Sequence, residues 1–167
     1  MKWYKLTLLS ILSGLLLGFA WYPHGLPFII FFAFIPLFFV SDSLLLKKSK
    51  VPFLKGFLFS LPAFLVWNTL TTWWIGKCTI AGVLAAIAIN SIMMSFTFGL
   101  WHLCKSKPIP KVFYSFLFVS FWMTFEFIHL NWDLTWPWLN LGNLFAVCPR
   151  YVQWYSVTGT FGGTLWI

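Results

Sequence analysis

The sequence predicts an all-α membrane protein, a polytopic helical bundle with five complete transmembrane helices and the start of a sixth. Hydrophobic residues make up 60% of the 167 residues and charged residues only 8%, whereas a soluble domain has about 25% charged residues. The apolar residues also form long blocks, and about 20 of them in a row allow a helix to cross the hydrocarbon core. Helices are expected because lipid cannot satisfy free backbone groups and the blocks lack the alternation of barrel strands.

The first two spans are expected at about residues 3–22 and 26–40, joined by a tight turn over 23–25 that contains His24. Lysines precede the first apolar run, so a secretory signal is the alternative reading of this segment. No small-residue cleavage site follows the run, and we therefore expect an uncleaved transmembrane helix.

Three further spans are expected at about residues 56–75, 80–103 and 112–130, with a kink at Pro62 in the first of them. A sixth apolar segment begins at about residue 151 and continues to Ile167. It is shorter than the about 20 residues that a complete span needs, so we expect the chain to stop within a span. We assign residues 1–167 to one transmembrane domain.

Positive charge predicts the orientation, because short cytoplasmic loops retain lysine and translocated loops avoid it. With a cytoplasmic N-terminus, only Lys77 and Arg150 of the 11 basic residues fall outside. The net charge of +8 is therefore a topology signal and gives affinity for anionic headgroups, and no nucleic-acid partner is expected. The basic residues predicted on the cytoplasmic side are Lys2, Lys5, Lys47, Lys48, Lys50, Lys55, Lys105, Lys107 and Lys111.

A polar and tryptophan-rich stretch, EFIHLNWDLTWPWLNLGN, follows from Glu126 and ends the fifth span on the outer side. Trp132, Trp136 and Trp138 are typical of an interfacial belt, where indole rings lie among lipid headgroups. A belt does not explain Glu126, whose carboxylate lies near the negative end of the helix dipole and needs a compensating partner or a functional cavity.

His129 lies on the same helix face as Glu126, three residues further on, and can supply a hydrogen bond or a positive charge. A structural Glu–His pair and a substrate contact are both open interpretations of these two residues. Asn68 lies near the outer end of the third span, at the same depth, and can line one polar cavity with Glu126 and Asn140.

No residue of this chain is predicted to be catalytic. Cys78, Cys104 and Cys148 are the three thiols, and a reactive thiol needs a base or an electropositive site. Cys148 has Arg150 nearby in the sequence but no evident His or Glu partner. The histidines lie in different segments without ligand spacing, so neither a metal ion nor a cofactor is expected.

Several motifs resemble the amino-terminal membrane domain of apolipoprotein N-acyltransferases, and they cover nearly the whole chain. The most specific motif is the Trp-Pro-Trp-Leu-x-Leu-Gly block. The matching segments are LSG (12–14), PHG (23–25), IPL (35–37), WN (67–68), TTWW (71–74), WDLTWPWLNLGN (132–143), QWY (153–155), TG (158–159) and GGTLWI (162–167).

The resemblance implies a step of bacterial lipoprotein maturation in the cytoplasmic (inner) membrane. The family transfers an acyl chain from a phospholipid donor to the α-amino group of the diacylglyceryl-cysteine of an apolipoprotein acceptor, through a thioester on a nitrilase-like domain. That catalytic domain is not found in these 167 residues, so we expect them to be inactive alone. The candidate substrate or lipid contacts are Glu126, His129, Trp132, Trp136, Trp138, Asn140 and Asn68.

The alternative is a small polytopic membrane protein that is not an enzyme, such as a transporter subunit or an assembly factor. A transporter would be favoured by an internal repeat or by paired broken helices. The sequence shows neither of these features.

The predicted orientation can be tested with the native thiols. With a cytoplasmic N-terminus, Cys78 and Cys148 face outward and Cys104 faces the cytoplasm. A membrane-impermeant maleimide added to intact spheroplasts should therefore label Cys78 and Cys148 but spare Cys104, as measured by mass spectrometry of the labelled peptides. Labelling of Cys104 in sealed spheroplasts would contradict the predicted orientation.

Overall fold

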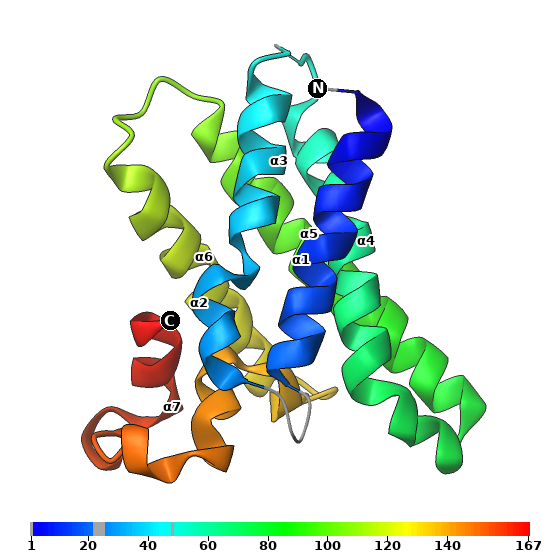
Figure 1. The fold of residues 1–167 in the computed structure, drawn as a ribbon, viewed down its shortest axis with the longest axis vertical. Coiled ribbons are helices and arrows are strands. Elements are labelled where there is room, and N and C mark those ends of the chain that lie inside the picture. Colours follow the sequence, from blue (N-terminus) through cyan, green and yellow to red (C-terminus); the bar gives the residue numbers. More distant parts are fainter. Residues whose placement is uncertain (1, 22–25, 48) are drawn as a thin grey trace.

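The computed structural model describes residues 2–21, 26–47 and 49–167, and these residues form a bundle of helices without a strand (Figure 1). The predicted turn over 23–25, with His24, lies outside the described residues. Five segments are long and apolar enough to cross a membrane, which confirms the predicted fold class. They are Trp3–Ala20, Pro27–Leu45, Pro52–Lys77, Ile80–Lys105 and Phe113–Leu130.

The second segment is a series of short helices: η1 (Pro27–Ile29), α2 (Ile30–Ala33) and α3 (Ile35–Leu45). The break falls at Phe34, two residues before Pro36. Proline lacks the N–H that would continue the hydrogen-bond ladder, and its ring displaces the preceding carbonyls. The interruption therefore follows from the sequence.

Helix α3 extends to Leu45, beyond the end predicted near residue 40. The expected span thus left out the polar residues Ser41 and Asp42. In the structure, the Ser41 Oγ lies 2.8 Å from the Nδ1 of His102, and the Asp42 carboxylate pairs with the Lys105 ammonium at 2.7 Å. Partners on a distant helix allow these polar residues to remain helical.

The third and fourth spans form an antiparallel hairpin (Figure 1). Helix α4 (Pro52–Thr72) contains Pro62 and continues into η2 (Trp73–Lys77), and α5 (Ile80–Lys105) runs back beside it. Helix α6 (Phe113–Leu130) then packs against α5. Short connections between successive helices favour this arrangement of neighbours.

Helix α1 (Trp3–Ala20) packs against both α3 and α4. The buried Ser10 hydroxyl donates to the Phe59 carbonyl of α4, and the buried Ser13 hydroxyl donates to the Ala33 carbonyl at the end of α2. Each acceptor lies three residues before a proline, where the helix ladder is disturbed. One face of α1 thus supplies donors to the carbonyls that lie just before Pro36 and Pro62.

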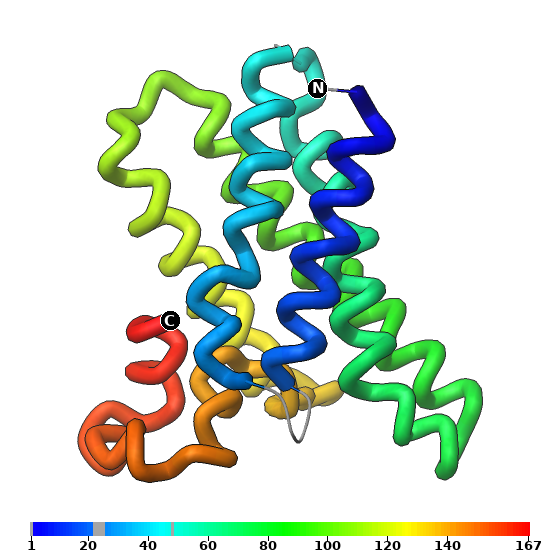
Figure 2. Tube along the Cα trace, viewed as in Figure 1, coloured from blue at the N-terminus to red at the C-terminus, as the bar shows by residue number. Residues whose placement is uncertain are grey.

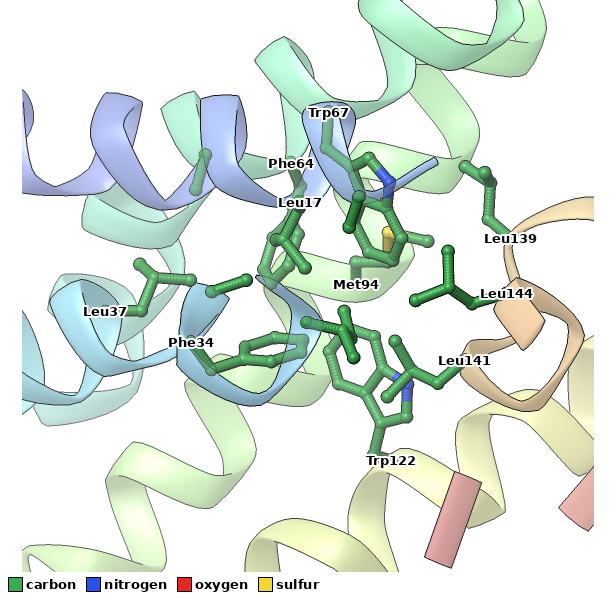
Figure 3. Close-up of a cluster of buried hydrophobic side chains, with 14 of the residues drawn as sticks. Leu17, Phe34, Leu37, Phe64, Trp67, Met94, Trp122, Leu139, Leu141 and Leu144 are labelled. Carbon is green, nitrogen blue, oxygen red and sulfur yellow. The ribbon is translucent and has the colours of Figure 1, made fainter. Parts of the chain in front are cut away.

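The core lies where the helices meet the segment that follows α6 (Figure 3). Trp67 of α4 and Trp122 of α6 stack, with ring centroids 6.4 Å apart and an interplanar angle of 20°. Leu139, Leu141 and Leu144 point into the same cluster and are each 4% exposed. These leucines close one end of the bundle.

The segment after α6 contains η3 (Pro137–Leu139), η4 (Leu141–Val147) and η5 (Pro149–Tyr151), followed by α7 (Tyr155–Trp166). The chain turns back toward the bundle here and ends at about its mid-height (Figure 2). The segment that we expected to start a sixth span is a short helix with a break at Gly159, where φ is 64°. Glycine adopts this left-handed conformation without a steric penalty.

The two ends of the bundle carry different connections (Figure 1). The N-terminus and the α3–α4 and α5–α6 connections lie at one end, and the sequence places most lysines in these segments. The α4–α5 connection and the segment after α6 lie at the other end, which we call the outer end after the predicted orientation. The arrangement of connections agrees with that orientation, which stays a prediction.

Gly14 lies where α1 comes close to the backbone of α4. A Cβ atom there would overlap the Ala63 carbonyl and lie 2.9 Å from the Cβ of Val66. The sequence at Gly14 and Gly18 has the small-x-x-x-small pattern that allows close helix contact.

We expect Gly14→Ala to destabilise the bundle, although alanine is the better helix former, because the clash involves backbone atoms that cannot move aside. Overpacking of this kind costs about 1–3 kcal/mol. The thermal midpoint in detergent, followed by size-exclusion chromatography, should fall. Gly76→Ala is the matched control, since a Cβ there meets only the Val83 Cγ1 at 3.5 Å. Equal midpoints for the two variants would contradict the close approach.

Candidate functional site

The carboxylate of Glu126 is the centre of a buried hydrogen-bond network at the outer end. Its Oε1 accepts hydrogen bonds from the indole N–H of Trp122 at 3.1 Å and from the backbone N–H of Leu141 at 2.7 Å. Its Oε2 accepts from the Thr164 hydroxyl at 2.7 Å. Glu126 is 1% exposed, so three donors replace water around the carboxylate.

A second layer of contacts supports this network. The Thr164 Oγ accepts from the backbone N–H of Gly142 at 3.0 Å, and the Tyr155 hydroxyl donates to the Gly142 carbonyl at 2.8 Å. A Cβ on Gly142 would overlap the Thr160 carbonyl, and a Cβ on Gly163 would lie 2.8 Å from the Cα of Gly142. The backbones of η4 and α7 therefore meet at glycines because no larger residue fits there.

Glu126 thus joins three elements that are separate in the sequence: α6, η4 and α7. Within the described residues, the ion pair between Lys105 and Asp42 is the one salt bridge, and Glu126 has neutral donors only. Both carboxylate oxygens are occupied and enclosed. This geometry suits a residue that fixes the segment after α6, which we call the outer segment, to the bundle.

Glu126 and His129 have separate partners, which corrects the idea of a Glu–His pair. The His129 Nε2 lies 2.6 Å from the Oδ1 of Asn90 on α5, and its ring stacks on Phe125 and lies against Trp132. Spacing along a helix correctly placed Glu126 and His129 on nearby faces. It could not identify partners on other helices, and both residues find theirs there.

The three tryptophans of the motif differ in their surroundings. Trp138 is 59% exposed and fits the predicted interfacial position. Trp132 and Trp136 are half-buried, and their indole nitrogens are enclosed. The backbone N–H of Trp136 donates to the His129 carbonyl at 3.4 Å, which folds this part of the chain back over the end of α6.

Asn68 and Asn140 lie in different environments. Asn68 is fully buried between α4 and α5, and its Nδ2 donates to the Phe64 carbonyl at 2.9 Å and to the Met94 sulfur at 3.5 Å. Asn140 is 5% exposed and lies beside Leu141 in the segment that Glu126 holds. A contact of Asn68 with substrate would require rearrangement, because no surface of this residue is accessible.

The structure brings several residues to the network that the sequence analysis did not single out. Trp122 lies one helical turn before Glu126, so the spacing could have identified it as a donor. Thr164 and Leu141 lie 38 and 15 residues away, and no local pattern indicates them. The sequence indicated only that a buried carboxylate must have hydrogen-bond donors, without identifying the residues that supply them.

The thiols lie outside this network. Cys78 is exposed, and Cys104 and Cys148 are partly buried. Where the chain is described, no three His, Cys, Asp or Glu side chains gather into a group that could hold a metal ion.

We expect Glu126→Gln to be nearly tolerated and Glu126→Leu to be strongly destabilising. The amide oxygen of glutamine can still accept from Trp122 and Leu141, whereas leucine leaves three donors without an acceptor. Each buried donor left unpaired costs about 1–3 kcal/mol. The yield and thermal midpoint of folded protein in detergent should follow the order wild type, Gln, Leu.

A matched pair of threonine variants checks the same network from α7. Thr164→Val removes the hydroxyl that donates to Glu126, whereas Thr158→Val changes an exposed hydroxyl that bonds only within its own turn. Only Thr164→Val should lower the thermal midpoint.

The outcome that would contradict both predictions concerns Glu126 itself. If Glu126→Leu is as stable as wild type, the carboxylate does not hold the outer segment.

Comparison with known proteins identifies the family of the chain. Residues 13–167 match the family described as the apolipoprotein N-acyltransferase N-terminal domain. An apolipoprotein N-acyltransferase of Chlorobaculum tepidum is 25% identical over 163 residues, which make up 95% of this chain and 29% of that protein. The chain thus spans less than a third of the length of this curated relative. No solved structure shows a significant match. The chain belongs to the apolipoprotein N-acyltransferase N-terminal domain family.

Proposed function

We propose that this chain is the membrane domain of an apolipoprotein N-acyltransferase and that it gathers the lipid-anchored substrates of the reaction. The reaction is transfer of an acyl chain from a phospholipid to the free α-amino group of a diacylglyceryl-cysteine at the start of an apolipoprotein. Membership of the family and the name of the relative support this assignment. In this proposal the protein lies in the bacterial inner membrane with its N-terminus in the cytoplasm.

The observation that carries the proposal is the attachment of the tryptophan-rich outer segment to the bundle through Glu126. Its carboxylate receives donors from α6, η4 and α7, and leucines of the segment fill the core below. A loop held in this way cannot change its height relative to the helices without breaking buried hydrogen bonds. The loop therefore holds its tryptophans as a fixed aromatic surface, which in this proposal lies at the depth of the lipid headgroups.

A fixed surface at this depth serves a reaction between two lipid-anchored molecules. Both substrates diffuse in the membrane plane, and the reacting ester and amine must meet one nucleophile. Holding reactants in the correct geometry contributes about 7–11 kcal/mol to the lowering of a barrier in favourable cases. The membrane domain contributes this positioning, while the covalent chemistry needs groups that the described part of the chain does not bring together.

Acyl transfer through a thioester needs a thiolate, a base and an oxyanion stabiliser within mutual reach. Among the described residues at the outer end, His129 and Glu126 are the candidates for a base, and each hydrogen-bonds to partners other than a cysteine. We therefore propose that residues 1–167 bind substrate but do not transfer an acyl group by themselves.

To test this, the purified chain is mixed with phospholipid and a synthetic diacylglyceryl-cysteinyl peptide. We expect retention of the lipidated peptide, measured by native mass spectrometry, without a triacylated product or a hydroxylamine-sensitive adduct on Cys78, Cys104 or Cys148. Heat-treated chain and the same peptide without lipid are the controls. A triacylated product would place the catalytic groups within this chain, and failure to retain the lipidated peptide would refute the gathering role.

A further inference from the structure

A cluster of charged and aromatic residues lies at the end of the bundle opposite the outer end, where α1, α3 and α4 meet (Figure 1). The ring of Trp3, at the start of α1, stacks on Phe59 of α4, with ring centroids 5.4 Å apart and an interplanar angle of 22°. The ammonium of Lys47, just beyond the end of α3, lies 4.0 Å from the centroid of the same indole. The ammonium of Lys55 of α4 lies 5.4 Å from it. Three helices thus bring two cations to one aromatic ring.

Among the described residues, these two lysines have no counter-ion. The sequence has only three acidic residues, and the structure places each of them elsewhere. Asp42 pairs with Lys105 at 2.7 Å, and Glu126 is enclosed by its three donors. Asp133 lines a cleft beside α5 at the outer end. The indole attracts both cations, but their positive charge remains unbalanced within the chain.

The unbalanced charge indicates an anion from outside the protein. Lys2 and Lys5 are exposed at the same end of α1 and raise the positive potential around the ring. A phosphate group has several acceptor oxygens, so it can accept from two ammonium groups at once in strong, charge-assisted hydrogen bonds. An anion that reaches Lys47 and Lys55 together would offset the repulsion between them.

The apolar surroundings of the two lysines favour an anion that carries acyl chains. Trp3 is 51% exposed, and Leu54 and Leu58, on the turns of α4 next to Lys55, are 46% and 51% exposed. A water-soluble phosphate compound would satisfy the lysines and leave these leucines uncovered. A zwitterionic lipid would bring a cation of its own beside the lysines. In the predicted orientation this end faces the cytoplasmic leaflet, where anionic lipids attract basic segments.

We propose that Trp3, Lys47 and Lys55 form a binding site for one anionic phospholipid, with its phosphate between the two ammonium groups and its acyl chains along Leu54 and Leu58. The lipid supplies the counter-ion that the chain lacks and fixes the start of α1 to α3 and α4. It is a structural ligand and not an acyl donor, because it lies at the end opposite the tryptophan-rich outer segment. The site does not depend on the proposed function.

The test compares two double variants that lose the same charge at the same end of the bundle. Lys47→Gln with Lys55→Gln removes both ammonium groups of the site, whereas Lys107→Gln with Lys111→Gln removes two exposed lysines of the α5–α6 connection. Each chain is titrated in detergent with phosphatidylglycerol, and bound lipid is measured by native mass spectrometry.

We expect the site variant to bind phosphatidylglycerol about tenfold more weakly than wild type, because two charge-assisted hydrogen bonds are lost. The control variant should change binding less than about twofold, since at about 0.15 M salt exposed charges further away than about 8 Å are largely screened. Without lipid, the two variants should have similar thermal midpoints, because neither removes apolar packing.

A single substitution can supply the missing counter-ion from the protein itself. Lys55→Glu places a carboxylate near Lys47, and an acidic residue in the first turn of α4 suits the positive end of the helix dipole. Phosphatidylglycerol should raise the thermal midpoint of wild type, because a ligand that binds the folded state stabilises it. Lys55→Glu should lose this rise although it is at least as stable as wild type without lipid, and Lys107→Glu, the control, should keep it. This pair keeps the test decisive if the double variant folds poorly.

The proposal is wrong if the two double variants bind phosphatidylglycerol equally, or if phosphatidylcholine with the same acyl chains binds wild type as tightly. It is also wrong if inorganic phosphate displaces the lipid at a similar concentration, because the site then selects a free anion. None of these measurements involves peptide retention or acyl transfer. A failure here therefore leaves the proposed function intact, and a failure of peptide retention leaves this site intact.

Discussion

A backbone group that loses its helical partner within hydrocarbon must find another partner in the protein, because water is absent there. This constraint accounts for the roles of Glu126 and of two buried serines. Ser10 and Ser13 donate to carbonyls near two prolines, and Glu126 accepts the N–H of Leu141, where the chain is not in a regular α-helix. At Leu141 the irregular backbone is tolerated because Glu126 of α6 supplies the acceptor, and the two serines add donors to carbonyls beside the turns that the prolines disturb.

The tryptophan-rich motif performs three separate tasks. Leu139 and Leu141 face inward and close the bundle. The backbone N–H of Leu141 also donates to Glu126, which holds α7 as well through Thr164. Trp132 and Trp136 line a surface cleft together with Ala85 and Ala86 of α5. The motif is therefore specific because one short stretch must fill a core, offer a backbone donor to a carboxylate and shape a surface.

The sequence predicted the fold class well because span length and hydropathy are local properties. It misjudged the end of α3, since Ser41 and Asp42 remain helical through partners on α5 that no local pattern reveals. It identified Glu126 correctly as a residue in need of compensation. The identity of its partners depends on contacts across 15 and 38 residues, and only the folded chain places Leu141 and Thr164 there.

The distance in sequence between Glu126 and Thr164 has a consequence for synthesis on the ribosome. Helix α6 is complete before the residues that supply two of the three donors have been made. At about 5–20 residues per second, the 38 residues to Thr164 require roughly 2–8 seconds. The Trp122 indole is the one donor already made when α6 is complete, Leu141 follows 15 residues after Glu126, and the set of donors is complete only once α7 has been made.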